Sequence, residues 1–393
     1  MVRRPFSSRV PSDLGSNRLS QAIASARASG QPLIDLTQSN PTRVDFDYPD
    51  YLLSALADAR GLKYEPSPFG LLGARQAVAR DYARRGAEVS ADRVALTAST
   101  SEAYSLLFKL LGDAGDEVLA PRPSYPLFEH LAQLDAVTIR PYDLEYHDGW
   151  TIDMASVERA FSERTRALLV VTPNNPTGSF VTRYELKRLA ELCAERGVAI
   201  VADEVFADYQ LRPGACVDAG RVMDLHEGLV FSLGGLSKTV GLPQIKLAWI
   251  AVGGANDLVA DALARLEVIC DTYLSVSTPI QAAAAELLNR GAAVRKQIQA
   301  RIAANYRALA EQLEGTPACR LLAADGGWSA IVRVPSIGSE EDLVLDLVAK
   351  GVVVHPGYFF DLPHESFLVA SLLPAEDQFA EGIGRVLRHV ESL

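Results

Sequence analysis

Short apolar segments that alternate with longer amphipathic segments are the feature that most constrains the fold of this chain. The apolar segments resemble strands and occupy residues 93–97, 117–120, 136–141, 167–172, 198–203, 229–233 and 246–252. Segments with helical periodicity lie between them, for example at residues 102–111 and 182–196. This alternation is typical of a mostly parallel sheet covered by helices. We therefore predict an α/β fold with a mostly parallel seven-stranded sheet.

The pattern changes after residue 275, which indicates a second folding unit. An Ala-rich helical stretch covers residues 279–313, and a strand at 328–334, a helix at 340–350, a strand at 352–355 and a closing helix follow it. A chain of 393 residues is also longer than most single cores. We predict a large domain at residues 48–275 and a smaller α+β domain that combines residues 1–47 with residues 276–393.

Composition argues against several classes of partner. The formal net charge is −11, from 38 Lys and Arg against 49 Asp and Glu, and no Lys or Arg run is longer than two residues. Such a chain repels phosphate backbones and anionic lipids, so we expect neither nucleic acid nor a membrane as partner. The four cysteines form no C-x-x-C pair, which favours reduced thiols over a disulfide framework or a metal site. With no apolar window near ~20 residues and no signal-like start, we expect a cytoplasmic protein.

Polar residues follow several of the expected strands, where parallel α/β sheets place their active sites. Ser99, Thr100 and Ser101 come after the first strand and directly before a helix. A helix N-terminus offers free N–H groups to an anion, although such a turn also serves as an ordinary N-cap. Asn175 follows the strand at 167–172 inside a proline-rich turn, which leaves its amide at the strand end.

A carboxylate and a lysine follow the next two strands. Asp203 ends a run of residues without charge. If its carboxylate is buried there, it requires a cationic partner; the alternative is an acid on a solvated loop, which requires none. Lys238 lies in a Gly-rich turn, but Ser237 stands where a P-loop needs glycine, so that motif fails. A partly desolvated amine suits imine chemistry. Each residue alone is commonplace, and the conjunction is informative.

The order and spacing of these motifs resemble a known family. In chain order they are Ser99-Thr100-Ser101, Pro123-Ser124-Tyr125-Pro126, Asn175-Pro176-Thr177-Gly178, Asp203-Glu204, Ser237-Lys238 and Lys246. Asn175 and Asp203 are 28 residues apart, and Asp203 and Lys238 are 35 apart. The chain resembles the class I/II aminotransferases of the fold-type I pyridoxal-phosphate enzymes over nearly its whole length.

The resemblance implies an enzyme with pyridoxal 5′-phosphate as cofactor. Lys238 would form the Schiff base with the cofactor and carry the proton of the reaction. Asp203 would pair with the pyridine nitrogen, Asn175 would bind the ring hydroxyl oxygen, and Tyr125 would stack on the ring. The implied reaction transfers an amino group between an amino acid and a 2-oxo acid.

The resemblance also implies a phosphate site and a homodimer. Ser99, Thr100 and Ser101 would hold the cofactor phosphate with help from Lys246. Tyr64 would reach the same phosphate from a neighbouring subunit, because sites in this family are built at the subunit interface.

Several positions depart from the family pattern. Phe206 replaces a tyrosine, Gly235 replaces a serine, and Lys246 stands where arginine is usual. Val369 stands two residues before Ser371, at the place of the arginine that usually binds the substrate α-carboxylate.

Without this arginine, the resemblance does not indicate which residue binds the substrate carboxylate. Arg43, next to the Asn40-Pro41-Thr42 loop that lines the substrate pocket in the family, is the preferred replacement, and Arg333 is the reserve; for each, a solvated side chain is the alternative. The rival function is a lyase or cyclase that acts at the β or γ carbon of an amino acid. A cofactor-binding regulator without catalysis is a third reading, and the few residues before Leu36 argue against it.

Overall fold

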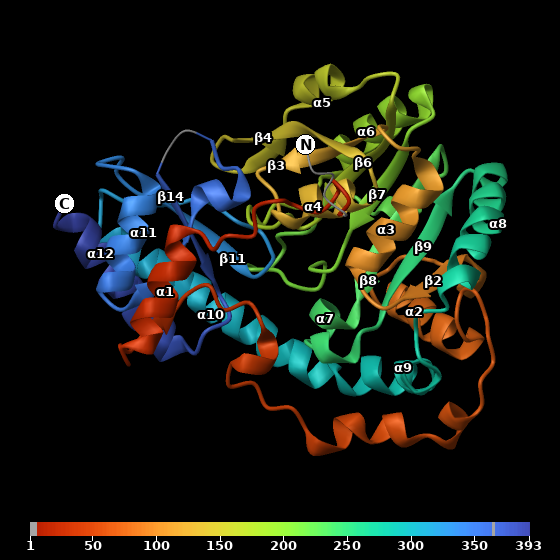
Figure 1. Ribbon diagram of the computed structural model, residues 1–393, viewed down its shortest axis with the longest axis horizontal. Helices are drawn as coiled ribbons and strands as arrows, with labels where there is room; N and C mark the ends of the chain where they lie inside the picture. Colours follow the sequence, from red (N-terminus) through yellow and green to blue (C-terminus); the bar gives the residue numbers. More distant parts are fainter. Residues whose placement is uncertain (1–5, 364–365) are drawn as a thin grey trace.

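A computed structural model describes residues 6–363 and 366–393 and contains one large sheet and two smaller ones (Figure 1). The eight strands of the large sheet lie in the order β2-β9-β8-β7-β6-β3-β4-β5. Their bounds are β2 Val94–Thr97, β3 Glu117–Arg122, β4 Thr138–Tyr146, β5 Trp150–Ile152, β6 Thr165–Val171, β7 Ala199–Asp203, β8 Leu229–Gly235 and β9 Ala248–Gly254. Strands β4, β3, β6, β7 and β8 are parallel to their neighbours in this series, and β9 is antiparallel to β8 and β2.

All seven expected strands are present, and the mostly parallel sheet is confirmed. The eighth strand, β5, forms an antiparallel hairpin with the long strand β4 at the sheet edge. The sequence did not predict β5, because a strand of three residues is too short to show periodicity. The large sheet therefore has eight strands and not the expected seven.

Helices cover both faces of the large sheet. Alternate residues of each strand face opposite sides: Val118 packs in the cluster under α3, α4 and α8, and Leu119 packs in the cluster under α5 and α6. Helices α2 and α9 cover β2 and β9. Their bounds are α2 Leu72–Arg84, α3 Thr100–Leu111, α4 Leu127–Leu134, α5 Met154–Ala160, α6 Arg183–Arg196, α8 Asn256–Tyr273 and α9 Thr278–Arg290. Among the described residues, no helix combines the length and apolarity that crossing a membrane requires.

The expected smaller α+β unit is built on a four-stranded antiparallel sheet (Figure 1). Its strand order is β10 (Arg320–Leu321), β11 (Ser329–Arg333), β14 (Phe367–Ser371) and β13 (His355–Pro356), and β1 (Ile34–Asp35) pairs with β12 (Val352–Val353) beside it. Helices α1 (Arg18–Ala28), α10 (Ala292–Glu314), α11 (Glu340–Ala349) and α12 (Glu376–Glu391) pack around these strands. Short 3-10 helices occur at Pro41–Arg43, Asp50–Ala57, Ala59–Leu62, Ala91–Arg93, Val222–Asp224, Pro243–Ile245 and Gly357–Phe360.

The expected helix at residues 279–313 is in fact two helices. Gly291 ends α9 and begins α10, and a side chain there would meet the Leu287 carbonyl at 2.6 Å and Val240 at 2.6 Å. The long helix α10 then runs toward the smaller sheet (Figure 1). Because Ala283 and Leu287 of α9 pack in the cluster of α2 and β9, this helix lies on the large sheet. The proposed domain division at residue 275 stays a prediction, and residues 1–5 and 364–365 of the expected small domain lie outside the described residues.

The two units meet at the carboxyl edge of the large sheet. The turn that contains Asn175 follows β6, and the Gly178 carbonyl accepts hydrogen bonds from the backbone N–H groups of Asp325 and Gly326, at 3.1 and 2.9 Å. Gly178 has φ +72°, and a Cβ there would lie 2.5 Å from the Gly326 oxygen. This close approach places β11 directly above the strand ends.

Gly178→Ala should lower the free energy of unfolding by about 2–4 kcal/mol, because alanine is strained at this φ and collides with the Gly326 carbonyl. Gly149→Ala is the matched control, since no heavy atom lies within 4 Å of its added carbon, and its effect should stay within ~0.5 kcal/mol. Urea unfolding measures both. Equal stability of the two variants would contradict this account of the junction.

Candidate active site

Asp203 is a buried carboxylate at the end of the central strand β7. Its residue is 8% exposed, and it pairs in register with Val171 of β6 and Leu233 of β8. The Tyr104 hydroxyl donates to Oδ2 at 3.0 Å, and the Val205 N–H donates to Oδ1 at 3.1 Å. Burial raises the pKa of Asp203 from 3.8 to about 6, against the lowering effect of these two hydrogen bonds. The carboxylate therefore favours a further N–H donor or cation in the cleft.

Lys238 lies in the short helix α7 (Leu236–Thr239) that follows β8. Its Nζ is 4.9 Å from the centre of the Trp328 ring and 5.7 Å from that of Phe206, and it makes no hydrogen bond within the described residues. Burial lowers the pKa of Lys238, and the charge of Asp203 opposes this shift. The Tyr209 hydroxyl donates to the Lys238 carbonyl at 2.5 Å and fixes the turn. The result is an amine that loses its proton more easily than a solvated lysine.

Asn175 lies in the turn after β6, the strand that pairs with β7. Its Oδ1 accepts a hydrogen bond from the Ser329 hydroxyl of β11 at 3.1 Å. The turn itself is held by Asn174, whose Oδ1 accepts from the Thr177 hydroxyl at 3.0 Å. The Asn175 amide nitrogen has no hydrogen-bond partner among the described residues, so it is free to donate.

The expected phosphate turn begins helix α3. The Ser99 hydroxyl accepts from the Glu102 N–H at 3.1 Å, and Glu102 Oε2 accepts from the Ala98 N–H at 2.6 Å, so Ser99 is the N-cap. Thr100 and Ser101 are the first helical residues, whose N–H groups have no partner within a helix. The cap and an anion site are therefore compatible, but the Ser99 hydroxyl is already used by the helix.

Three other expected cofactor residues lie on the surface of the single chain. Tyr125 precedes α4 and is 46% exposed, with its ring 6.5 Å from that of Phe128. Lys246 is exposed in the turn before β9 and forms no ion pair with any described residue. Tyr64 is 72% exposed.

The segment with Asn40 and Arg43 is tied to the smaller sheet and to the Lys238 turn. The Ser371 hydroxyl donates to the Gln38 carbonyl at 2.6 Å, and the Tyr48 hydroxyl donates to the Gly241 carbonyl at 2.7 Å. Asn40 Oδ1 accepts from Thr42, and Arg43 is exposed.

Arg333 lies elsewhere. It is exposed at the far end of β11, about 13 Å along the strand from Ser329, and lines a surface groove with Cys319 and Pro335. The structure therefore does not bring Arg333 to the cleft beside Asn175.

Val369 is an apolar core residue. It is 1% exposed, pairs with Ile331 and His355 in the smaller sheet, and packs with Phe360 and Phe367. No charged group occupies the position where the family places its arginine.

Three site residues were missing from the sequence-based prediction. Tyr104 bonds Asp203, Tyr209 bonds the Lys238 carbonyl, and Trp328 lies against the Lys238 amine. Tyr104 follows the apolar stripe of its helix, so it reads as a core residue. In the sequence, Trp328 indicated only the start of a strand. Its contact with Lys238 could not be predicted, because that contact depends on how the two units pack.

Solved structures with this architecture define the class. The alanine aminotransferase of Pyrococcus furiosus superposes with a TM-score of 0.86 over 95% of this chain and 96% of its own, at 21% identity. The aspartate aminotransferase of Thermotoga maritima gives 0.82 over 98% and 100%, at 22% identity. The chain therefore has the fold of the fold-type I aminotransferases.

The sequence comparisons assign the family. Residues 26–377 match the family described as aminotransferase class I and II, and the chain belongs to it. Nicotianamine aminotransferase B of Hordeum vulgare is 31% identical over 278 residues, which are 67% of this chain and 49% of that protein. Alanine aminotransferase of Mycobacterium tuberculosis is 27% identical over 379 residues, 93% of this chain and 87% of that protein. The chain thus spans about half the length of the nicotianamine aminotransferases it matches.

In the cofactor-free protein, the difference in free energy of unfolding between Asp203→Asn and the unchanged chain should favour the variant more at pH 7 than at pH 4. The folded-state pKa of Asp203 is raised, so the favourable protonated form is lost as pH rises through about 6. The variant has no charge to bury, so its advantage should grow by about 2–3 kcal/mol between pH 4 and pH 7. Urea unfolding across this range measures the difference, and a pH-independent difference would refute the buried-carboxylate assignment.

Proposed function

We propose that this chain is a pyridoxal 5′-phosphate-dependent aminotransferase that transfers an amino group between an amino acid and a 2-oxo acid. The observation that carries the proposal is the buried Asp203 and the buried, unbonded Lys238 amine at the ends of the neighbouring strands β7 and β8. When bound, pyridoxal phosphate supplies a reactive aldehyde carbon and an electron-accepting ring. The residues at this edge fit that group, because a raised carboxyl pKa calls for an N–H donor and a lowered amine pKa suits imine formation.

Asp203 would pair with the pyridine nitrogen and hold its proton in place. The hydrogen bonds from Tyr104 and Val205 fix the carboxylate, so it needs no reorganisation when the ring arrives. An N–H donor at this place compensates for the burial that raises the Asp203 pKa.

Lys238 would hold the aldehyde carbon and would move the proton at the substrate α-carbon. Its lowered pKa gives a larger share of neutral amine, which is the form that accepts a proton. The Trp328 and Phe206 rings shield the amine from water, and the Tyr209 bond orients the turn that carries it.

The remaining groups position the ring and its phosphate. Asn175 would donate its amide to the ring oxygen, and Tyr125 would cover the ring face. Thr100 and Ser101 bind the phosphate through N–H and hydroxyl groups at the start of α3, and Ser99 contributes as their cap. Lys246 neutralises the phosphate charge.

The substrate carboxylate is bound by Arg43, with Asn40 shaping the loop. Val369 offers no charge, and Arg333 lies on the outer end of β11, so Arg43 is the better placed of the two arginines. The bonds from Ser371 and Tyr48 hold the Arg43 segment between the smaller sheet and the Lys238 turn.

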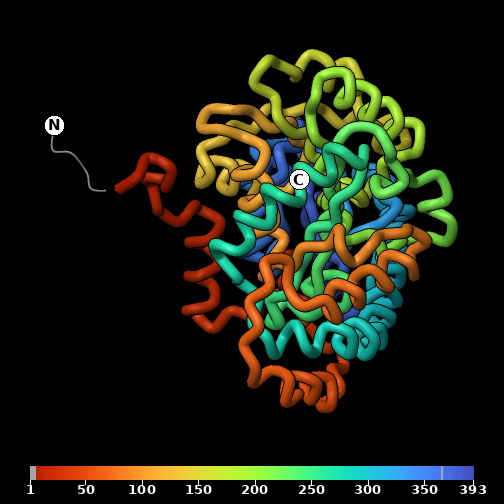
Figure 2. Tube along the Cα trace, turned by 90° about the vertical axis from the view of Figure 1, so that its right-hand side faces the viewer, coloured from red at the N-terminus to blue at the C-terminus, as the bar shows by residue number. Residues whose placement is uncertain are grey.

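A homodimer completes the site in this proposal. Tyr64 lies in a segment, residues 51–72, that carries several exposed apolar side chains, namely Tyr51, Leu53, Leu62 and Leu72. Both views show this segment along one edge of the molecule, outside α9 (Figures 1 and 2). A partner chain that covers this segment brings Tyr64 to the partner's phosphate. The cysteine usage, which favours reduced thiols, supports a cytoplasmic location for such an enzyme.

A lyase or cyclase acting at the β or γ carbon is the second candidate, and the apolar Val369 favours it. Amino acids tested one at a time separate the two reactions. A transaminase converts the cofactor to its amino form and releases the 2-oxo acid, whereas a lyase releases ammonia and leaves the cofactor unchanged.

Lys238→Ala should abolish amino-group transfer, with a loss of at least about 10⁴-fold in kcat, because the variant lacks the amine proposed to move the proton at the α-carbon. Lys187→Ala, an exposed lysine of α6, is the control and should keep full activity. Coupled measurement of 2-oxo acid release checks both. Substantial turnover by the Lys238 variant would overturn the mechanism.

Arg43→Ala should raise the KM for amino acids at least about tenfold and change the rate with amines that lack a carboxylate much less, because one charge-assisted contact is removed. Arg333→Ala should change neither. Initial rates with matched amino acid and amine donors give the comparison. An equal loss on both donor types would remove Arg43 from the carboxylate site.

A further inference from the structure

A cavity apart from the Asp203 and Lys238 site lies beside the C-terminal end of α2. Its volume is about 350 Å³, within the range of small-molecule sites. Neither Asp203 nor Lys238 lines it. Its charged walls are Arg84, Arg85, Arg183, Arg221, Glu204 and Asp208, four guanidinium groups against two carboxylates. In a chain with net charge −11, this concentration of arginine needs an explanation.

Arg85 is the unusual member of this set. Its side chain is only 16% exposed, and its Cζ lies 4.6 Å from the centre of the Tyr82 ring. Its guanidinium makes no hydrogen bond within the described residues, and Nε is 3.7 Å from Asp81 Oδ2. A buried guanidinium normally uses its donors. Arg85 therefore has N–H groups to offer to a ligand.

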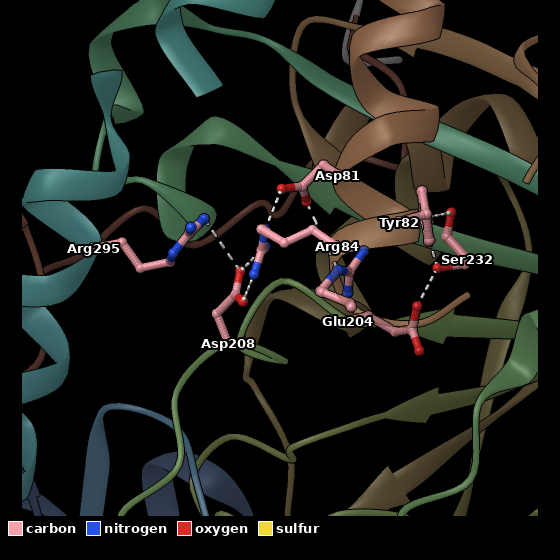
Figure 3. Close-up of polar contacts among 8 residues, drawn as sticks. Asp81, Tyr82, Arg84, Glu204, Asp208, Ser232 and Arg295 are labelled. Atoms are coloured by element: carbon pink, nitrogen blue, oxygen red, sulfur yellow. Dashed lines mark hydrogen bonds and ion pairs between the residues drawn. The ribbon is translucent and has the colours of Figure 1, made fainter. Parts of the chain in front are cut away.

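Most of the carboxylates near Arg85 pair with other arginines. Arg84 binds Asp208 through two parallel bonds of 2.7 and 2.8 Å, and Arg295 of α10 lies 3.7 Å from the same carboxylate (Figure 3). Arg84 also bonds Asp81 at 2.9 Å. This leaves Glu204 as the cavity's one carboxylate without an arginine bond among the described residues.

Glu204 in turn accepts a hydrogen bond from the Ser232 hydroxyl, which bonds the Tyr82 hydroxyl at 2.8 Å (Figure 3). Glu204 therefore offsets part of the charge of Arg85 without bonding it.

Two further arginines stand at the exposed rim. Arg183 donates to the Val217 carbonyl at 2.6 Å, and Arg221 donates to the Gly86 carbonyl and lies 3.6 Å from Asp224. Each keeps further N–H groups free. The cavity thus presents donors at two places, on Arg85 inside and on the two rim arginines.

We propose that this cavity binds a small anion with two or more carboxylate or phosphate groups. One anionic group contacts the Arg85 guanidinium, and a second contacts Arg183 and Arg221, because a guanidinium group suits planar, two-pronged recognition of a carboxylate or phosphate. A ligand held this way ties the 216–221 segment to the end of α2. The site is independent of the cofactor and of amino-group transfer.

The test is calorimetric titration of the protein saturated with pyridoxal phosphate, so that the cofactor's own anion site is filled. Citrate probes the carboxylate source and pyrophosphate probes the phosphate source, in a buffer without other polyanions. We expect one site per chain for at least one probe. Arg85→Gln should weaken it at least about tenfold, and Arg183→Gln at least about threefold.

Arg80→Gln is the matched control, since Arg80 is exposed on the same helix and does not line the cavity. It removes the same charge and should leave the affinity unchanged. No binding of either probe overturns the proposal, and so does an equal weakening by Arg80→Gln, which would indicate general electrostatic attraction. If Arg85→Gln does not fold, Arg183→Gln and Arg221→Gln decide, and unchanged affinity in both refutes the site.

Discussion

The structure of the cleft depends on one buried carboxylate at the end of a central strand. Asp203 is flanked by Val171 and Leu233, and a charge in such surroundings is costly unless polar groups meet it. The Tyr104 hydroxyl and the Val205 N–H supply part of that compensation. The pKa of Asp203 remains raised because these two hydrogen bonds do not fully offset the effect of burial. Each carboxylate oxygen of Asp203 accepts one hydrogen bond and can accept another, which a ring nitrogen could donate.

The chain after Asp203 links this acid to the other parts of the cleft. Within one short segment, Asp208 is bound by Arg84 of α2, and the Tyr209 hydroxyl bonds the carbonyl of Lys238. The Gly178 carbonyl joins the turn after β6 to the chain before β11. The Tyr209 bond thus ties the turn that carries Lys238 to the segment that follows Asp203.

Much of this arrangement could be predicted from the sequence, because apolar runs mark the strands and strand ends mark the cleft. Asp203 and Lys238 stood out only in conjunction with the other motifs that follow the expected strands. Tyr104 did not, because a tyrosine on an apolar helix stripe looks like any core residue. The orientation of Arg333 depends on which end of β11 meets the large sheet, and the break at Gly291 depends on the close approach of Val240. Such properties arise from packing and have no local signature.

The central claim is that the Lys238 amine, one of seven lysines in the chain, is the group that reacts with the cofactor. Borohydride reduction of the protein loaded with pyridoxal phosphate, followed by peptide mass mapping, tests it directly. The account predicts a single stoichiometric label on Lys238, because burial lowers its pKa and Asp203 lies beside it. A label on Lys246 or another exposed lysine, or labelling spread over several lysines, would contradict it.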